Sequence, residues 1–369
     1  MAGLPATNGQ RLAIRKLTLD GESQTGDMSA YLIAQTDHFH APPLLDPRAN
    51  WHKEWHHFCI VSSDIQVILN FNLSGDIRPE APPGAQLTRV ILLVREGCWD
   101  GDVDSILPRD SVFRPGVIDL HFGHNSVRFE NGIFKLSAAL QDRPVGLVLQ
   151  LRPIALPMLM RNNVPIGLGT INWLVVPRLV ASGTVTVGRQ VHILNEAPTY
   201  HDHNWGSWLW GQDFAWEWGF ALPDHVDVPW SLVFDRTLNR RRSHILESKL
   251  ALWKNSELRR VFTQSEIKVL PAGHLSVTRL PKFPRVMALV APEFTTDIPR
   301  YLDISAAAGA DSLLCHFEAR DVAQIIIPNE TDLGITVLNE VTGHLELEGN
   351  VKGELVHMQG GAIFEFLTQ

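Results

Sequence analysis

The sequence predicts an all-β protein built of antiparallel sandwiches or barrels. Short segments rich in branched apolar residues, such as 65–73, 87–95 and 145–152, are bounded by Gly, Pro, Asp or Asn. Segments of this kind recur about every ten residues, which is the spacing typical of antiparallel sandwiches and barrels. Helical periodicity is scarce, and we predict only two short helices, at 303–309 and 320–325.

The chain is long enough for two such domains. Its 369 residues exceed the size at which one hydrophobic core usually stops growing. Hydrophobic residues make up 45% and charged residues 20%, which leaves apolar material for two cores. The turn at 195–198 breaks the strand pattern. We therefore predict an N-terminal β domain over 1–195, beginning with an irregular segment, and a C-terminal β domain over 196–369.

The net charge and the cysteine content indicate which binding partners and which cellular compartment to expect. A net charge of -8 disfavours nucleic acid and anionic lipid, and the basic run at 236–242 is predicted to be a solvated hairpin tip. Cys59, Cys98 and Cys315 are too scattered for a disulfide framework and are expected to be buried. No secretory signal or apolar span of ~20 residues is present. We expect a cytoplasmic protein without an integral membrane segment.

The most informative segment is 200–211, Tyr-His-Asp-His-Asn-Trp-Gly-Ser-Trp-Leu-Trp-Gly, which is followed by Phe-Ala-Trp-Glu-Trp-Gly-Phe at 214–220. Ionisable side chains lie there among large aromatic rings. That mixture is costly for a core but suits a lined reaction pocket. We therefore predict that an active site, with a hydrophobic small molecule as its ligand, lies in this segment.

Strand geometry divides the motif into two faces. Because side chains alternate across a strand, Tyr200, Asp202 and Asn204 point one way. The other face carries His201, His203 and Trp205. In the second segment, the rings of Phe214, Trp216, Trp218 and Phe220 share a face that would fill a core. Glu217 lies on the opposite face among small residues, and the space beside it makes this carboxylate a site candidate.

Acid-base catalysis is the first function that the ionisable side chains of this motif could serve. Asp202 is predicted to be a general acid or base whose pKa is raised by aromatic surroundings. Tyr200 and Asn204 would orient a substrate or water beside it. The structural alternative is an aspartate that accepts backbone hydrogen bonds at a strand end.

Metal binding is a second use, since His201 and His203 share a face and the pairs His38-x-His40 and His56-His57 offer further ligands. No carboxylate accompanies them at a diagnostic offset, so we predict no metal. A His-ligated, metal-dependent isomerase or hydrolase stays open as an alternative.

A ring-lined cavity that stabilises a developing carbocation is a third use, because aromatic faces attract positive charge. The alternative is that the tryptophans only fill a β core. Neither a nucleophile elbow nor a glycine-rich phosphate loop occurs, so we predict no nucleotide or other cofactor.

The motifs resemble a known superfamily. Residues 200–206 and 214–220 resemble the Asp-His-Asn-Trp-Gly signature of the carotenoid hydratase (hydroxyneurosporene synthase) and AttH-like superfamily. Residues 54–58, Glu-Trp-His-His-Phe, resemble its N-terminal Glu-Trp-Trp-Tyr-Phe segment, and 176–185 resemble its Pro-Arg-Leu, Ser-Gly stretch. The resemblance covers roughly residues 50–235.

The resemblance implies two consecutive lipocalin-like (calycin) β-barrel or sandwich domains with a pocket at their interface. The superfamily also includes kievitone hydratase and Diels-Alderase-type cyclases. In its hydratases a Tyr-x-Asp pair is associated with proton donation, and the matching positions here are Tyr200 and Asp202.

Together these observations predict a cofactor-independent hydratase, lyase or cyclase for an isoprenoid, polyene or polyketide-like small molecule of secondary metabolism, such as carotenoid or terpenoid biosynthesis. The predicted catalytic residues are Asp202, Tyr200, His203 and Glu217. The predicted substrate-binding residues are His201, Asn204, Trp205, Trp216, Trp218, Trp173, Glu54 and Trp55. A non-catalytic lipocalin-like carrier of an apolar ligand is the main alternative, and the sequence leaves the oligomeric state open.

Overall fold

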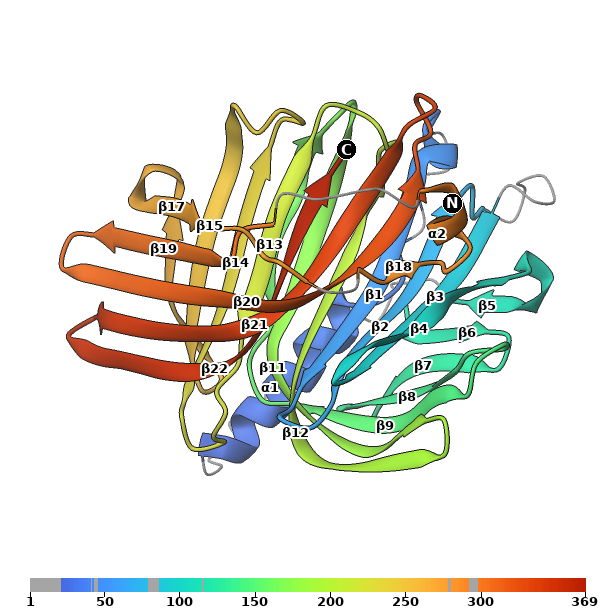
Figure 1. Ribbon diagram of the computed structural model, residues 1–369. Helices are drawn as coiled ribbons and strands as arrows, with labels where there is room; N and C mark the ends of the chain where they lie inside the picture. Colours follow the sequence, from blue (N-terminus) through green and yellow to red (C-terminus); the bar gives the residue numbers. More distant parts are fainter. Residues whose placement is uncertain are drawn as a thin grey trace, which may run out of the picture.

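Two large β-sheets, one from each half of the chain, lie side by side (Figure 1). The computed structural model describes residues 21–40, 42, 46–78, 86–114, 116–277, 280–291 and 298–369. Each sheet curves around a hydrophobic core of its own, and a third core lies between the sheets. The predicted fold class, all-β with two β-barrel domains, is confirmed. The first 20 residues of the predicted irregular segment lie outside the described residues.

The first sheet is antiparallel and places the predicted site motif at its centre. Its strands are β1 (His52–Val61), β2 (Gln66–Gly75), β3 (Gln86–Glu96), β4 (Cys98–Ile106), β5 (Ser111–Phe113), β6 (Asp119–Phe122), β7 (Asn125–Glu130), β8 (Ile133–Ala139), β9 (Val145–Pro153), β10 (Met158–Ile166), β11 (Gly169–Val187) and β12 (Gln190–Ser207). Their order is β4-β3-β2-β1-β12-β11-β9-β8-β7-β6-β5, and β10 pairs with β11. The branched apolar segments predicted as strands at 87–95 and 145–152 fall within β3 and β9, and the segment at 65–73 begins one residue before β2.

The second sheet holds the strands β13 (Ala215–Ala221), β14 (Trp230–Leu238), β15 (Ile245–Lys254), β16 (Glu257–Thr263), β17 (Ile267–Ala272), β18 (Lys282–Phe283), β19 (Tyr301–Ala308), β20 (Asp311–Pro328), β21 (Ile335–Val351) and β22 (Glu354–Thr368). Their order is β16-β15-β14-β13-β22-β21-β20-β19-β17, and β18 pairs with β20. The helices predicted at 303–309 and 320–325 are wrong. Burial alternates at Leu302, Ile304 and Ala306, so β19 follows the period of a strand.

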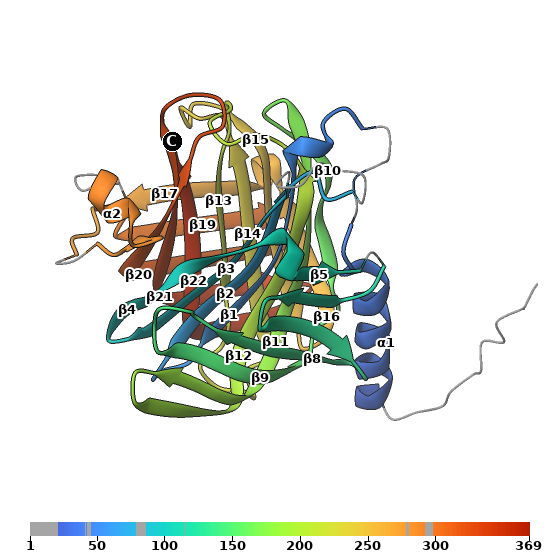
Figure 2. The same cartoon turned by 90° about the vertical axis from the view of Figure 1, so that its right-hand side faces the viewer.

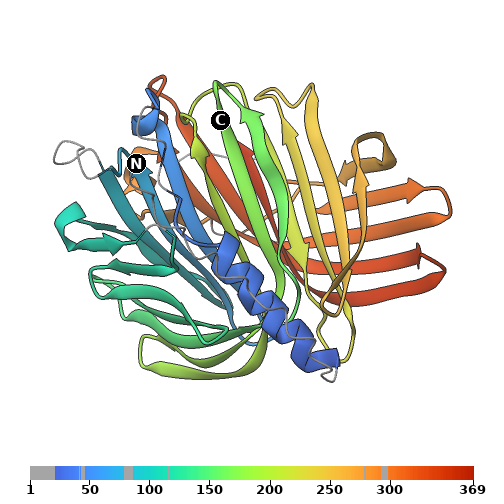
Figure 3. The ribbon, with the colours of Figure 1, turned by 180° about the vertical axis from the view of Figure 1, so that it is seen from behind.

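One helix of four turns went unpredicted. The helix α1 (Gly21–Thr36) lies against the first sheet (Figures 2 and 3). Ile33 is buried in the first core, and the Ser29 hydroxyl donates to the Ala155 carbonyl at 3.0 Å. The other helical segments are short: η1 (Ala49–Trp51), η2 (Pro108–Asp110), η3 (Gln264–Glu266) and α2 (Met287–Val290). Within the described residues, no helix has the length and apolar character needed to cross a membrane.

The two halves are tied together across the third core. A segment of the second half around β18 and α2 reaches over β4, where the Arg285 amide donates to Asp102 at 2.9 Å. The chain changes sheet between Ser207 and Ala215, whereas the predicted boundary at 195 and 196 lies within β12. We propose to draw the domain boundary at the change of sheet.

Two of the three cysteines are buried as predicted. Cys59 and Cys315 lie in the cores. Cys98 is exposed, and its predicted burial is wrong. The reason is its place directly after Gly97, whose φ of 78° turns the chain from β3 into β4 at the surface.

Candidate active site

Residues 200–207 of the predicted motif are on β12, between β1 and β11. The division of its side chains into two faces is confirmed. Asp202 and Asn204 line a cavity between the two sheets, and Tyr200 packs beside them in the third core. His201 points the other way, into the first barrel, where its ring stacks on Phe58 with centroids 4.1 Å apart.

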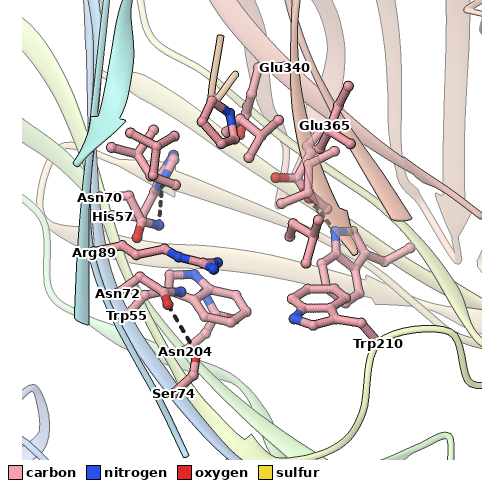
Figure 4. Close-up of a pocket in the computed structure, with 18 of the residues that line it drawn as sticks. Trp55, His57, Asn70, Asn72, Ser74, Arg89, Asn204, Trp210, Glu340 and Glu365 are labelled. Atoms are coloured by element: carbon pink, nitrogen blue, oxygen red, sulfur yellow. Dashed lines mark hydrogen bonds between the residues drawn. The ribbon is translucent and has the colours of Figure 1, made fainter. Parts of the chain in front are cut away.

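The cavity has a volume of about 350 Å³, which is within the range of small-molecule sites. Both sheets supply its walls, and Pro284, Val286 and Met287 contribute from the segment that crosses between them. Figure 4 shows Trp55, Asn72 and Arg89 on one side, with Trp210 and Glu365 across the cavity. The predicted substrate-binding residues found in the lining are Trp55, Trp173, Asn204, Trp216 and Trp218.

Asp202 is an almost fully buried carboxyl group on this apolar wall, with 2% of its surface exposed. Burial raises its pKa to about 7, while His201, Tyr200 and Trp173 act in the opposite direction. The Asn204 amide donates to Asp202 Oδ1 at 2.8 Å and fixes the carboxyl group. Burial also raises the pKa of Tyr200 well above its usual value, so its hydroxyl keeps its proton.

Two further carboxyl groups, which the sequence analysis missed, lie on the wall formed by the second sheet. Glu340 on β21 is paired in register with Glu365 on β22, and both line the cavity. Burial raises the pKa of each, and their mutual interaction raises that of Glu340 further. The Trp216 indole donates to Glu365. Two adjacent buried carboxyl groups share one proton more readily than they both ionise.

A signal for Glu365 exists in the sequence. It is a single carboxylate in the strand segment Phe364-Glu365-Phe366. With Phe364 in the core of the second barrel, strand alternation sends the Glu365 side chain to the opposite face. That face lies against the first sheet and carries the cavity.

Glu217 does not line the cavity, which differs from its predicted catalytic role. It is paired in register with Arg236 on β14, whose Nε atom donates to Glu217 Oε2 at 2.9 Å. Arg242 forms a second ion pair with the same carboxylate. The two arginines fill the space that the small neighbours of Glu217 leave, so the basic run is not simply a solvated hairpin tip. Trp216 and Trp218 belong to the core between the two sheets and also line the cavity, as expected of predicted substrate-binding residues.

We expect Glu217→Gln to lower stability and to leave turnover unchanged. The amide keeps the shape of the side chain but loses the charge that holds two arginines. Hydrogen bonds to charged groups contribute ~1.5–3 kcal/mol, so the free energy of unfolding should fall by about that amount. Urea unfolding and turnover per folded molecule measure the two effects. Lost turnover in a variant of unchanged stability would contradict this placement.

The predicted residues His201, His203, Glu54 and Trp205 lie behind the cavity, on the other face of the first sheet. His201 Nε2 lies 2.9 Å from Asp37 Oδ2, and His203 Nε2 lies 2.8 Å from Glu54 Oε1. The Trp205 ring stacks on His40 with centroids 3.9 Å apart. These side chains form a polar network within the first barrel and are not part of the cavity lining, which differs from the predicted catalytic role of His203 and the predicted substrate contacts of the other three.

This network is also where a metal ion fits best. Asp37, His56 and His201 form one group of three ligand-type side chains within 4.8 Å. His40, Glu54 and His203 form another. Both groups are separated from the cavity by the sheet itself, so an ion held there would not contact a substrate in the cavity. The geometry therefore gives no support to a metal-dependent isomerase or hydrolase at this site.

Comparison with known proteins finds the same fold. No family model matches the sequence, and no curated protein matches it. A solved structure assigned as AttH from Nitrosomonas europaea superposes with a TM-score of 0.62 at 15% identity, over 89% of this chain and 97% of that one. Kievitone hydratase from Nectria haematococca gives a TM-score of 0.55 at 12% identity, over 90% and 93%. The chain has their fold.

A third structure of this fold was solved with a bound small molecule. CghA in complex with Sch210972 superposes with a TM-score of 0.58 at 10% identity, over 86% of this chain and 88% of CghA. The fold that the motif resemblance implies is thus the fold that these solved structures share with this chain. At these identities the comparison establishes the architecture, and the reaction must be argued from the site.

Proposed function

We propose that this protein is a cofactor-independent hydratase, lyase or cyclase that acts by acid-base chemistry on a hydrophobic isoprenoid, polyene or polyketide-like small molecule. The observation that carries the proposal is the position of Asp202, a buried carboxyl group facing a tryptophan-lined cavity. A carboxylic acid held in apolar surroundings keeps its proton near neutral pH and can donate it. The fold shared with a kievitone hydratase supports this choice.

In the proposed hydration, Asp202 donates its proton to one carbon of a double bond. The neighbouring carbon becomes cationic, and the faces of Trp55, Trp173 and Trp218 stabilise it. Water attacks this carbon and loses a proton, which returns to the Asp202 carboxylate either directly or through the pair of Glu340 and Glu365. The sum is addition of one water molecule, with every carboxyl group restored. In a cyclisation, an internal double bond replaces water as the nucleophile, and the new cation loses a proton from a neighbouring carbon to the Asp202 carboxylate.

Isotope labelling tests the proposal without a known substrate. Purified protein is incubated with a panel of isoprenoid alcohols, polyenes and polyketide-type dienones in heavy-oxygen water and, separately, in deuterated water. A hydratase introduces the heavy oxygen into the product. A cyclase or isomerase introduces carbon-bound deuterium without oxygen. Genes for terpenoid, carotenoid or polyketide enzymes beside this one would direct the panel. No incorporation beyond the protein-free control across the panel would contradict the proposal.

The alternative to an enzyme is a lipocalin-like carrier that holds an apolar ligand in the same cavity and performs no chemistry. A carrier requires the aromatic walls of the cavity but not the carboxyl group of Asp202. Trp216→Ala would then weaken ligand binding, while Asp202→Asn would change nothing.

We further propose a role in secondary metabolism and a cytoplasmic location, as the motif resemblance and the sequence composition suggest.

The rate is expected to fall as pH rises through about 7. Burial raises the pKa of Asp202 to about 7, so the group is protonated and able to donate below that pH. Above it, the rate should drop about tenfold for each pH unit. The charged or titratable groups that face Asp202 are Tyr200, His57, Arg161, Glu340 and Glu365, with His201 behind it on the same strand. A pH profile of turnover checks this, and a rate that rises through neutral pH would contradict it.

A further inference from the structure

Arg89 on β3 is a cation in the wall of the cavity, and the part of the chain that the structure describes supplies no ion pair for it. Its side chain reaches into the cavity on the side of Trp55 and Asn72 (Figure 4). Within the described residues, no hydrogen bond or ion pair of its guanidinium is found. Glu330 acts on it electrostatically, but this carboxylate is ion-paired with Lys53 at 2.9 Å and accepts a hydrogen bond from the Trp210 amide.

The other arginine of the cavity wall shows how the protein normally treats such a group. Arg161 is buried and forms a two-pronged ion pair with Asp235. Arg89 loses hydration on burial, and the attraction of Glu330, which is already paired with Lys53, offsets only part of that loss. A ligand with a negative group removes this penalty when it binds. The planar fork of arginine matches a carboxylate with two parallel hydrogen bonds.

The neighbours of Arg89 form a polar row across the sheet. Five residues are paired in register on adjacent strands: Asn204, Trp55, Asn72, Arg89 and Ser105. All of them line the cavity. A second row lies two residues further along each strand. It contains Asp202, His57, Asn70, Ile91 and Val103. The acid and the cation therefore belong to neighbouring rows on one wall.

The register also sets the distance between the two groups. Arg89 is three strands away from Asp202 across the sheet and one row away along it. With strands ~4.8 Å apart and ~3.3 Å per residue, their Cα atoms are at most about 16 Å apart, and curvature of the sheet shortens this. Because both side chains line the same cavity, the bound anion and the reacting bond would lie within about 16 Å of each other.

We propose that the substrate is an amphipathic acid, whose carboxylate is held by Arg89 and whose unsaturated chain extends along the tryptophan-lined wall to Asp202. The inference deepens the proposed function and rests on it for the reaction at Asp202. The binding claim stands separately. Asn72 and Ser105, which flank Arg89 in the row, supply further hydrogen-bonding groups for the carboxylate oxygens.

Binding of cis-parinaric acid and of its methyl ester tests this inference. The acid is a fluorescent polyene carboxylate, and the ester keeps the polyene chain but replaces the charged oxygen with a neutral methoxy group. At a pH where the acid is ionised, we expect the protein to bind the acid about tenfold or more tightly than the ester. Arg89→Ala should remove this preference by weakening acid binding, with ester binding unchanged. Arg152→Ala, at an exposed arginine paired with Glu196, is the matched control and should change neither.

Equal affinities of the wild-type protein for acid and ester would overturn the inference. So would an Arg89→Ala variant that loses both ligands alike. If Arg89→Ala does not fold, the same titrations are carried out with Arg89→Met, which removes the charge but keeps much of the length of the side chain. The same titration with Asp202→Asn separates the two proposals, because it should retain the preference for the acid. If the wild-type protein prefers the acid but catalyses no reaction in labelled water, the protein is a carrier of acids. That result refutes the proposed catalysis and keeps the proposed role of Arg89.

Discussion

Asp202→Asn is expected to lower turnover by about 10²–10⁴-fold, the range that a positioned general acid contributes. The amide has nearly the same shape and can keep the hydrogen bond to Asn204 with its remaining oxygen. It cannot donate a proton to carbon at a useful rate, so the first step of the proposed reaction is lost. Turnover is measured on the substrate that labelled water identifies, with far-ultraviolet circular dichroism to confirm folding.

The matched control for this prediction is Asp64→Asn. Asp64 is an exposed aspartate between β1 and β2 that accepts a hydrogen bond from its neighbour Ser63. Its substitution makes the same chemical replacement, carboxyl to amide, without touching the cavity, so turnover should stay at the wild-type level. A folded Asp202→Asn protein with wild-type turnover would remove Asp202 from the chemistry.

Local alternation explains why part of this site was predictable. A strand through Tyr200, Asp202 and Asn204 puts the three side chains on one face whatever the sheet contains. The sequence therefore predicted that Asp202 and Asn204 would act together, and the structure places both at the cavity. The same rule separated His201 and His203 from them.

Pairing between distant strands explains what could not be predicted. Glu340 and Glu365 meet Asp202 only because β21 and β22 lie against the first sheet, and no local pattern specifies that contact. Glu217 is an example of a site residue that the sequence predicted wrongly for the same reason. Its small neighbours suggested open space, but the register of β13 against β14 brings Arg236 directly beside it. Cross-strand neighbours are set by register, which one strand's sequence does not contain.

Asp235→Ala is expected to lower the free energy of unfolding by about 3–5 kcal/mol, the usual cost of leaving a buried charge without its partner. The Arg161 Nε atom donates to Asp235 Oδ2 at 2.8 Å, and both side chains are buried. Arg161 is on β10 of the first sheet and Asp235 is on β14 of the second, so this ion pair joins the two barrels. Urea unfolding of the wild-type and variant proteins measures the loss.

A double replacement distinguishes the buried charge from the lost contact. Arg161→Met with Asp235→Leu removes both charges and keeps apolar volume, so we expect it to recover most of the stability that Asp235→Ala loses. Arg152→Ala, which breaks the exposed pair with Glu196, should cost no more than ~1 kcal/mol. If the double variant is as unstable as Asp235→Ala, the ion pair itself holds the barrels together. Because Arg161 also lies over the Trp173 ring at 5.5 Å, the wall beside Asp202 would then depend on the same pair.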